Sequence, residues 1–347
     1  MLTVESISAG TARSHLDARH GSPRRVDFGA DTPPIEVFRA GPVLYVPSAL
    51  DVGQSAQLLG DASMPIEAVF DDFTPSFVRQ RMLKKGVTQV VFEDSTVAGD
   101  VCILGNVFSR NFTHWHEELM KLVVLERGGF DCTFVVSELP AFAAELLRLF
   151  GVDPGRVLEV RRPVRFRSAL YGTPVSYRNV ADYPGVLLDL RRRLLAAAGV
   201  PLPDVGPRLW LDRGEQTRLG RRLVNPEEVH PLLERYGFER IDMGALPVAS
   251  QLAVARDARA MSGLHGSGFV HSQVMAPRSW VIEAFSPIYL NPTYTEIYRV
   301  LRHRYAQLTA TNTPIFPYQH GGDVLVDCQQ LELALYAATE AAEGGDA

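Results

Sequence analysis

The chain has 347 residues, of which 46% are hydrophobic and 22% charged, and its formal net charge is −5. This length suits two globular domains of roughly 150 residues each, and the composition excludes a disordered chain. The negative balance excludes an overall basic field for nucleic acid or an anionic membrane, although local clusters must be judged one by one. Three widely spaced cysteines and the lack of a long apolar run lead us to expect a cytoplasmic protein without a disulfide framework, signal peptide or transmembrane segment.

Residues 1–175 form the first predicted domain, in which strands are mixed with helices. A helix is predicted in "NFTHWHEELMKL", residues 111–122, with Asn111 as its cap. Helical periodicity places its titratable groups on one side and its large apolar groups on another. The titratable side carries His114, Glu117, Glu118 and Lys121, and the apolar side carries Trp115, Leu119 and Leu122. The strands expected around this helix include "PVLYVP", "QVVFED" and "CTFVV".

The titratable side of this helix permits two interpretations. A carboxylate one turn from an imidazole fixes its tautomer and raises its basicity, which a general base needs. A solvated polar face is the plainer interpretation. His116 and Glu117 begin the zinc motif H-E-x-x-H, but position 120 is Met, so we expect no metal site.

Residues 176–207 are interpreted as a connecting helix followed by a Pro-rich linker, and residues 208–310 as a second domain. Short apolar runs alternate there with helical periods, which is typical of a doubly wound parallel sheet. Asn225, Pro226 and Glu228 form a predicted capping box, and Gly237 ends that helix. A C-terminal helix and tail fill residues 311–347. The predicted order is strand 208–212, helix 226–236, strand 238–242, helix 247–258, strand 260–264, helix 267–276, strand 280–285, helix 293–303 and strand 304–309.

An arginine-rich loop follows the first strand of the second domain. Arg213 stands at the strand end, and three more arginines precede Asn225. The guanidinium fork suits phosphate oxygens, and four arginines could replace a metal ion, whereas a flexible basic loop is the alternative. The three loop arginines are Arg218, Arg221 and Arg222.

The stretch "SGLHGSGFVH", residues 262–271, lies where the third strand of this domain ends and a helix begins. Gly266 and Gly268 would let a ligand approach the backbone, and the helix start favours a diphosphate. His271 stands where a dinucleotide fingerprint needs its third glycine, so NAD is disfavoured. Ser267 lacks the flanking glycines of a hydrolase nucleophile elbow. A tight strand-to-helix turn is the alternative interpretation.

These motifs together resemble glycosyltransferase family 61, the DUF563 group that includes capsular-polysaccharide transferases. The resemblance covers roughly residues 100–310 and rests on "NFTHWHEEL", "LWLDR", "RRLVNPEEV", "LPVASQLAVARDA" and "SGLHGSGFVHSQVMAPRSWVIEAF". It implies a GT-B fold of two Rossmann-like domains facing across a cleft, with the first domain on the acceptor side and the second binding the nucleotide sugar. It also implies inverting, metal-independent sugar transfer from a nucleotide sugar, usually a UDP-sugar, to a glycan or other hydroxyl acceptor.

The resemblance also implies site residues, although the base stays open among His114, His116, Glu117 and Glu118. The chain departs from the family pattern at Pro226, where the family usually has Glu, and at His271, where it usually has Asn. The implied catalytic residues are His114, Glu118 and His265; the donor-binding residues are Arg213, Arg222, Asn225, Gln251, Gly266, Ser267, Gly268 and Glu283; and the acceptor-side residues are Trp115, His116 and Glu117.

Two other functions compete with this expectation. A non-catalytic sugar-nucleotide or glycan-binding subunit of a polysaccharide assembly complex would keep the fold without transfer. A Rossmann oxidoreductase would need the dinucleotide fingerprint that the chain lacks. A thermal-shift panel of nucleotides and nucleotide sugars separates the three.

Overall fold

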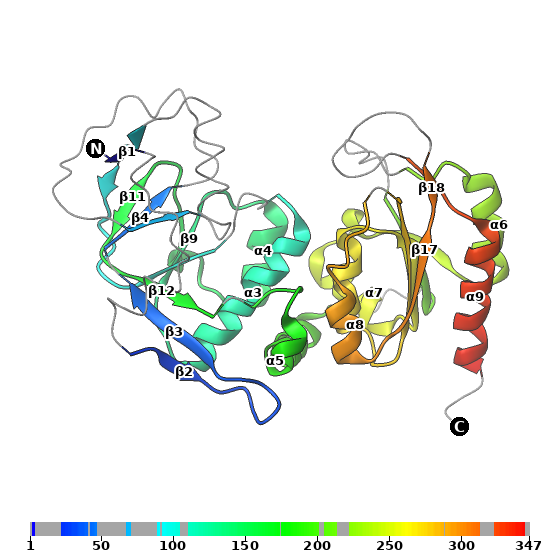
Figure 1. Ribbon diagram of the computed structural model, residues 1–347, viewed down its shortest axis with the longest axis horizontal. Helices are drawn as coiled ribbons and strands as arrows, with labels where there is room; N and C mark the ends of the chain where they lie inside the picture. The colour runs from blue at the N-terminus through cyan, green and yellow to red at the C-terminus, as the bar shows by residue number, and fades with distance from the viewer. Residues whose placement is uncertain are drawn as a thin grey trace. The chain divides into compact units, whose positions relative to one another are not determined.

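The computed structural model divides the chain into two compact units, Met1–Val175 and Ser176–Ala347, which are described separately (Figure 1). Each unit combines helices with β-sheets, so the expected α/β class is confirmed. In the described part of the chain, no helix combines the length and apolar character that crossing a bilayer requires. The structure describes residues 2–3, 22–40, 42–46, 67–70, 89–90, 92–104, 110–173, 175–200, 205–213, 222–287, 289–312 and 323–343.

The first unit contains a six-stranded sheet in the order β10-β9-β8-β12-β3-β2. Strands β8, β9 and β10 are neighbours in this sheet and run parallel. A helix connects β8 to β9, and another connects β9 to β10. Helix α3 spans Phe112–Arg127 and helix α4 spans Ala141–Leu149. The strands are β2 (Arg24–Val26), β3 (Ile35–Ala40), β8 (Val101–Ile103), β9 (Thr133–Val136), β10 (Val157–Glu159) and β12 (Ala169–Gly172).

Two smaller sheets complete the described strands of the first unit. The run "QVVFED" does not form one strand, because its two ends pair with different partners. Strand β6 (Gln89–Val90) pairs with β1 (Leu2–Thr3), and β7 (Glu93–Asp94) pairs with β11 (Val164–Phe166). The second sheet has the order β5-β4-β11-β7, with β5 at Glu67–Phe70 and β4 at Val43–Val46.

The second unit is built on a five-stranded parallel sheet in the order β14-β13-β15-β16-β17. The predicted alternation of strands and helices is therefore confirmed. Helices α6 and α9 contact each other, and α9 also contacts the sheet strands, whereas α5, α7 and α8 pack with the turn η6 (Figure 1). The elements are α5 (Pro184–Ala197), β13 (Arg208–Asp212), α6 (Pro226–Arg235), β14 (Glu239–Asp242), α7 (Val248–Asp257), β15 (Ala260–Leu264), η6 (Ser267–Val274), β16 (Trp280–Phe285), α8 (Thr295–Leu301), β17 (Arg304–Thr309), β18 (Thr311–Asn312), β19 (Val324–Leu325) and α9 (Cys328–Glu343).

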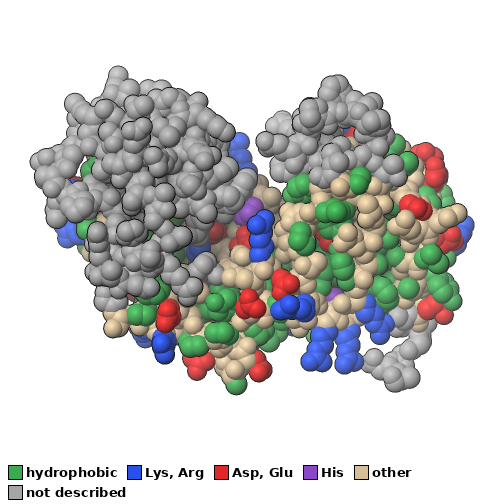
Figure 2. All heavy atoms as spheres, in the orientation of Figure 1, with side chains coloured by type: hydrophobic (Ala, Val, Ile, Leu, Met, Phe, Trp, Pro, Cys, Tyr) green, Lys and Arg blue, Asp and Glu red, His purple; other side chains and the backbone are tan. Residues whose placement is uncertain are grey.

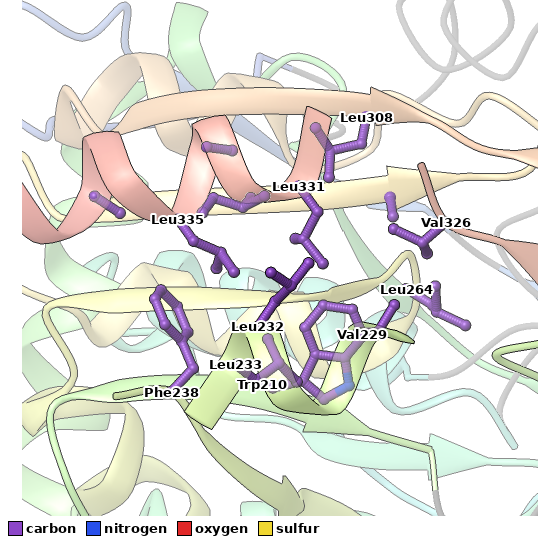
Figure 3. Close-up of a cluster of buried hydrophobic side chains, with 14 of the residues drawn as sticks. Trp210, Val229, Leu232, Leu233, Phe238, Leu264, Leu308, Val326, Leu331 and Leu335 are labelled. Atoms are coloured by element: carbon purple, nitrogen blue, oxygen red, sulfur yellow. The ribbon is translucent and has the colours of Figure 1, made fainter. Parts of the chain in front are cut away.

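A hydrophobic cluster joins the sheet of the second unit to α6 and α9 (Figure 3). Trp210 from β13 is 3% exposed, while Leu233 from α6 and Leu335 from α9 are fully buried. Burying a side chain of this size stabilises the fold by about 1.5–3 kcal/mol relative to leaving it exposed. The cluster thus fixes the sheet whose carboxyl edge carries several of the predicted site residues.

Two local predictions for the second unit are wrong. Asn225 stands at the N-cap of α6, but its side chain makes no capping hydrogen bond. It bonds instead to the backbone of Val326, which precedes α9. Residues 267–274 form a 3-10 helix where an α-helix was expected. The predicted end of α6 is confirmed, because Gly237 adopts a positive φ of 65° just after the C-cap residue Tyr236.

Candidate functional site

Several of the predicted site residues lie at the carboxyl edge of the sheet of the second unit. In the strand order, β13 lies between β14 and β15. The chain passes from β13 to β14 on one side of it, and then to β15 on the other side. Doubly wound sheets bind ligands outside the strand ends at such a switch point. Arg213 directly follows β13 and His265 directly follows β15, so both lie at this position.

The side chain of Arg213 contacts the backbone of the glycine-rich turn at residues 265–268. Its Nη1 donates a 2.8 Å hydrogen bond to the carbonyl oxygen of His265. A Cβ added to Gly266 would lie 2.7 Å from that Nη1, closer than such atoms can approach. The guanidinium therefore lies where a side chain at position 266 would be.

This contact gives Gly266 a structural role beside the predicted approach of a ligand. Gly266 leaves room for Arg213, whereas a Cβ on Gly268 would meet Leu211 Cδ1 at 3.0 Å. Gly268 is not among the residues with positive φ. A turn that needs a left-handed residue at position 268 is therefore not the reason for that glycine.

His265, directly after β15, and Glu283, on the adjacent strand β16, form a buried pair. Glu283 lies on β16, and its Oε1 is 2.6 Å from His265 Nδ1. Since a carboxylate only accepts hydrogen bonds, Nδ1 carries the proton and donates it. The two residues are 5% and 1% exposed. The pair sets the tautomer of an imidazole at the strand edge.

Two tyrosines hold the second oxygen of Glu283. The hydroxyl of Tyr298 on α8 donates to Oε2 at 3.2 Å, and that of Tyr305 on β17 donates at 3.5 Å. Burial, together with the charge of Glu283, raises the pKa of both tyrosines above their usual value, so both hydroxyls stay protonated donors. The buried carboxylate is thus surrounded by donors on both oxygens.

Aromatic rings surround His265. Phe285 stacks on the imidazole with ring centroids 4.6 Å apart, and Tyr289 and Tyr294 lie at 5.7 and 5.8 Å. Packing of this kind locks the ring orientation that Glu283 selects. Except for Glu283, these neighbours were not among the predicted site residues, although the tyrosines cluster in "YLNPTYTEIY" just after β16.

Other predicted donor residues have structural partners. The Gln251 amide donates to the Leu246 carbonyl at 2.8 Å, so its oxygen faces His271 Nε2, also at 2.8 Å. Arg222 is exposed and pairs with Asp323 at 3.2 Å. Ser267 and Gly268 are half-buried at the start of η6. Residues 201–204 of the predicted linker, and Arg218 and Arg221, lie outside the described residues.

The first unit presents a second pair at the start of α3. Asn111 Oδ1 accepts a 3.0 Å bond from the Thr113 amide, so the predicted cap is confirmed. His114 Nδ1 lies 3.1 Å from Glu117 Oε2, and both side chains are partly exposed. Helix α3 follows the parallel strand β8, so this pair also belongs to the carboxyl end of a parallel strand.

The neighbouring residues of α3 face inward. Glu118 is 3% exposed and pairs with Lys121 at 2.8 Å, and Lys121 also donates to the carbonyl of Ile103. Trp115 and His116 are fully buried. Of the four candidates for the base, only His114 and Glu117 combine partial exposure with mutual contact. Among the described residues, no group of three or more His, Cys, Asp or Glu side chains is arranged to hold a metal ion.

The comparison with protein families agrees with this arrangement. The sequence model of the family described as glycosyltransferase 61 matches residues 108–282, which is half of the chain and runs from just before α3 into β16. None of the curated proteins matches the chain with significant similarity. The matched span contains the His114–Glu117 pair, Arg213 and the His265 turn, and the chain belongs to the glycosyltransferase 61 family.

Proposed function

We propose that this glycosyltransferase moves a hexosyl or pentosyl group from a UDP-sugar to a hydroxyl of a glycan or similar acceptor, with inversion and without a metal ion. The proposal includes a GT-B arrangement in which the second unit binds the donor and the first supplies the base. The choice of UDP and a role in capsule or surface polysaccharide synthesis follow from the family resemblance. The proposed cytoplasmic location rests instead on the three widely spaced cysteines and the lack of a long apolar run.

The observation that carries the proposal is the contact of Arg213 with the His265 turn. It fixes a cation at the switch point of a parallel sheet, where doubly wound folds bind ligands. A preorganised guanidinium stabilises the charge that develops on a diphosphate as it leaves. We assign His265, oriented by Glu283, to the same leaving group.

His114 is the proposed base, oriented through Nδ1 by Glu117. The acceptor hydroxyl gives its proton to His114 Nε2 while its oxygen forms a bond to the anomeric carbon. The bond from that carbon to the donor phosphate oxygen breaks, and its electron pair leaves with UDP. One displacement inverts the configuration.

A thermal-shift panel tests donor binding. UDP and UDP-sugars should raise Tm equally with and without EDTA, and NAD should not. Loss of the shift on chelation would contradict metal independence. A shift with NAD alone would replace the proposal with the oxidoreductase alternative.

A UDP-release assay tests transfer. His114→Ala should abolish release while the donor-induced shift remains, and Glu117→Gln should lower turnover. Glu118→Gln is the matched control, since Glu118 is paired with Lys121 and should affect stability more than turnover. Donor binding without release from the wild-type protein, across a set of hydroxyl acceptors, would favour a non-catalytic subunit.

A further inference from the structure

Four arginines lie at one edge of the sheet of the second unit. This is the amino edge, opposite to the carboxyl edge where Arg213 lies. Parallel strands begin at one edge, and β15, β16 and β17 are neighbours there. The residues Arg259, Arg278, Arg302 and Arg304, here named the arginine edge, lie at or just before the starts of these three strands.

Backbone hydrogen bonds tie the arginine edge together. The Arg278 amide donates to the Leu301 carbonyl at 3.2 Å, beside Arg302. The Arg304 amide donates to Ser279 at 2.9 Å, and the Arg259 carbonyl accepts from Trp280 at 2.9 Å. The four positions therefore belong to one continuous surface. Neighbouring strands are about 4.8 Å apart, so the row spans roughly 10 Å.

All four side chains are exposed, and none forms an ion pair with an acidic residue in the described ranges. Two acidic residues near the arginine edge in sequence are engaged elsewhere: Asp257 pairs with Arg256 at 2.8 Å, and Glu296 pairs with Arg299 at 3.4 Å. Figure 2 shows Lys and Arg side chains gathered along the lower rim of the second unit. That rim is the amino edge of the sheet, since β18, which follows β17, lies near the top of the same view (Figure 1).

The backbone supplies a second and independent observation. Within the described residues, two non-glycine residues have positive φ, Arg278 at 66° and Arg302 at 56°. Arg302 is the C-cap of α8, a position where glycine is favoured because it lacks a Cβ. Both strained positions hold arginine, and both lie on the arginine edge. Strain kept at a surface position indicates a function for the side chain.

We propose that the arginine edge docks this protein on the phosphate headgroups of an anionic lipid bilayer. Guanidinium groups bind phosphates, and mobile lipids can match any spacing of the four side chains. Charges are screened beyond about 8 Å at physiological ionic strength, so a planar bilayer at this edge interacts with the arginines rather than with remote acidic residues. A long nucleic acid would continue past the edge over a molecule whose net charge is −5. The proposal is independent of the sugar donor.

Cosedimentation of the full chain with vesicles tests the proposal. Vesicles of phosphatidylcholine with phosphatidylglycerol should bind the protein, vesicles of phosphatidylcholine alone should not, and added salt should release it. Arg278→Gly and Arg302→Gly should each weaken binding about fivefold. Both variants should keep or raise Tm, because glycine adopts positive φ without strain.

Arg161→Ala is the matched control, since Arg161 is an exposed arginine of the first unit that pairs with Glu159, and its loss changes the net charge equally. It should bind vesicles as the wild type does. Equal binding to neutral vesicles, wild-type binding by the double glycine variant, or a lowered Tm in the glycine variants would overturn the proposal. Binding of an oligonucleotide without binding of anionic vesicles would overturn the choice of lipid.

Discussion

At the scale of single residues, the position of Arg213 depends on the missing side chain at Gly266. Gly266→Ala places a methyl group 2.7 Å from Arg213 Nη1, so the guanidinium must move from the His265 carbonyl. If Arg213 binds the donor diphosphate, the variant should lose a charge-assisted contact of about 1.5–3 kcal/mol, which corresponds to roughly 10–150-fold in UDP affinity. Isothermal titration with UDP measures this loss.

A double-mutant cycle tests whether Gly266→Ala lowers UDP affinity through Arg213. Gly266→Ala should have little further effect in an Arg213→Ala background, because both changes remove the same contact. Arg192→Ala is the control, since Arg192 is an exposed arginine paired with Asp189 on α5. Additive losses in the double variant would show that Gly266 contributes to binding separately from Arg213.

The tyrosines around Glu283 permit a graded prediction. Tyr298→Phe removes a hydrogen-bond donor from the buried Oε2 of Glu283. This loss should lower the free energy of unfolding by about 1–3 kcal/mol. Tyr305→Phe should have a smaller effect, because its 3.5 Å contact is at the limit of a hydrogen bond. Urea denaturation of the two variants gives the order, and a larger loss for Tyr305→Phe would contradict it.

At the scale of elements, much of the second unit could be predicted from its sequence. Strand β13 and strand β15 were predicted with the observed bounds, because apolar runs alternate with helical periods. The exceptions depend on partners distant in the chain. Asn225 has the sequence of a helix cap, but its amide is used by Val326, 101 residues away.

Part of the candidate site could also be predicted from the sequence. Arg213 and His265 could be placed at one sheet edge, because strand ends of a parallel sheet lie together. Local periodicity could not place Tyr298 or Tyr305 beside Glu283, since their contact depends on how α8 and β17 pack next to β16. It also could not tell that Glu117 contacts His114 or that Glu118 is buried and pairs with Lys121.

Asn225 connects the start of α6 to the segment before α9, and this connection can be tested. Its Nδ2 donates to the Val326 carbonyl at 2.9 Å, and its Oδ1 accepts from the Val326 amide at 3.1 Å. Asn225→Asp keeps the acceptor but turns a carboxylate toward a carbonyl, so it should destabilise the protein by about 1–3 kcal/mol in urea denaturation. A capping role alone would make Asp as favourable as Asn, and an unchanged midpoint would support that role instead.

At the scale of the whole molecule, two buried histidines should make stability depend on pH. Burial lowers the pKa of His271 to about 3 and that of His303 to about 4, from an ordinary value of 6.5. Both stay neutral in the folded protein at pH values where the unfolded chain takes up protons. Their stabilising contribution is therefore complete above pH 6.5 and is lost as the pH falls toward these values.

The size of this dependence can be measured by urea denaturation between about pH 6.5 and pH 5, where most carboxylates stay ionised. Each histidine should lower the free energy of unfolding by up to about 1.4 kcal/mol per pH unit. His303 Nε2 donates to the Ser272 carbonyl at 3.0 Å, a bond that a glutamine amide can imitate without titrating. His303→Gln should therefore reduce the slope by up to about half, because His271 continues to contribute. A slope equal to that of the wild type would show that His303 takes up its proton in the folded protein.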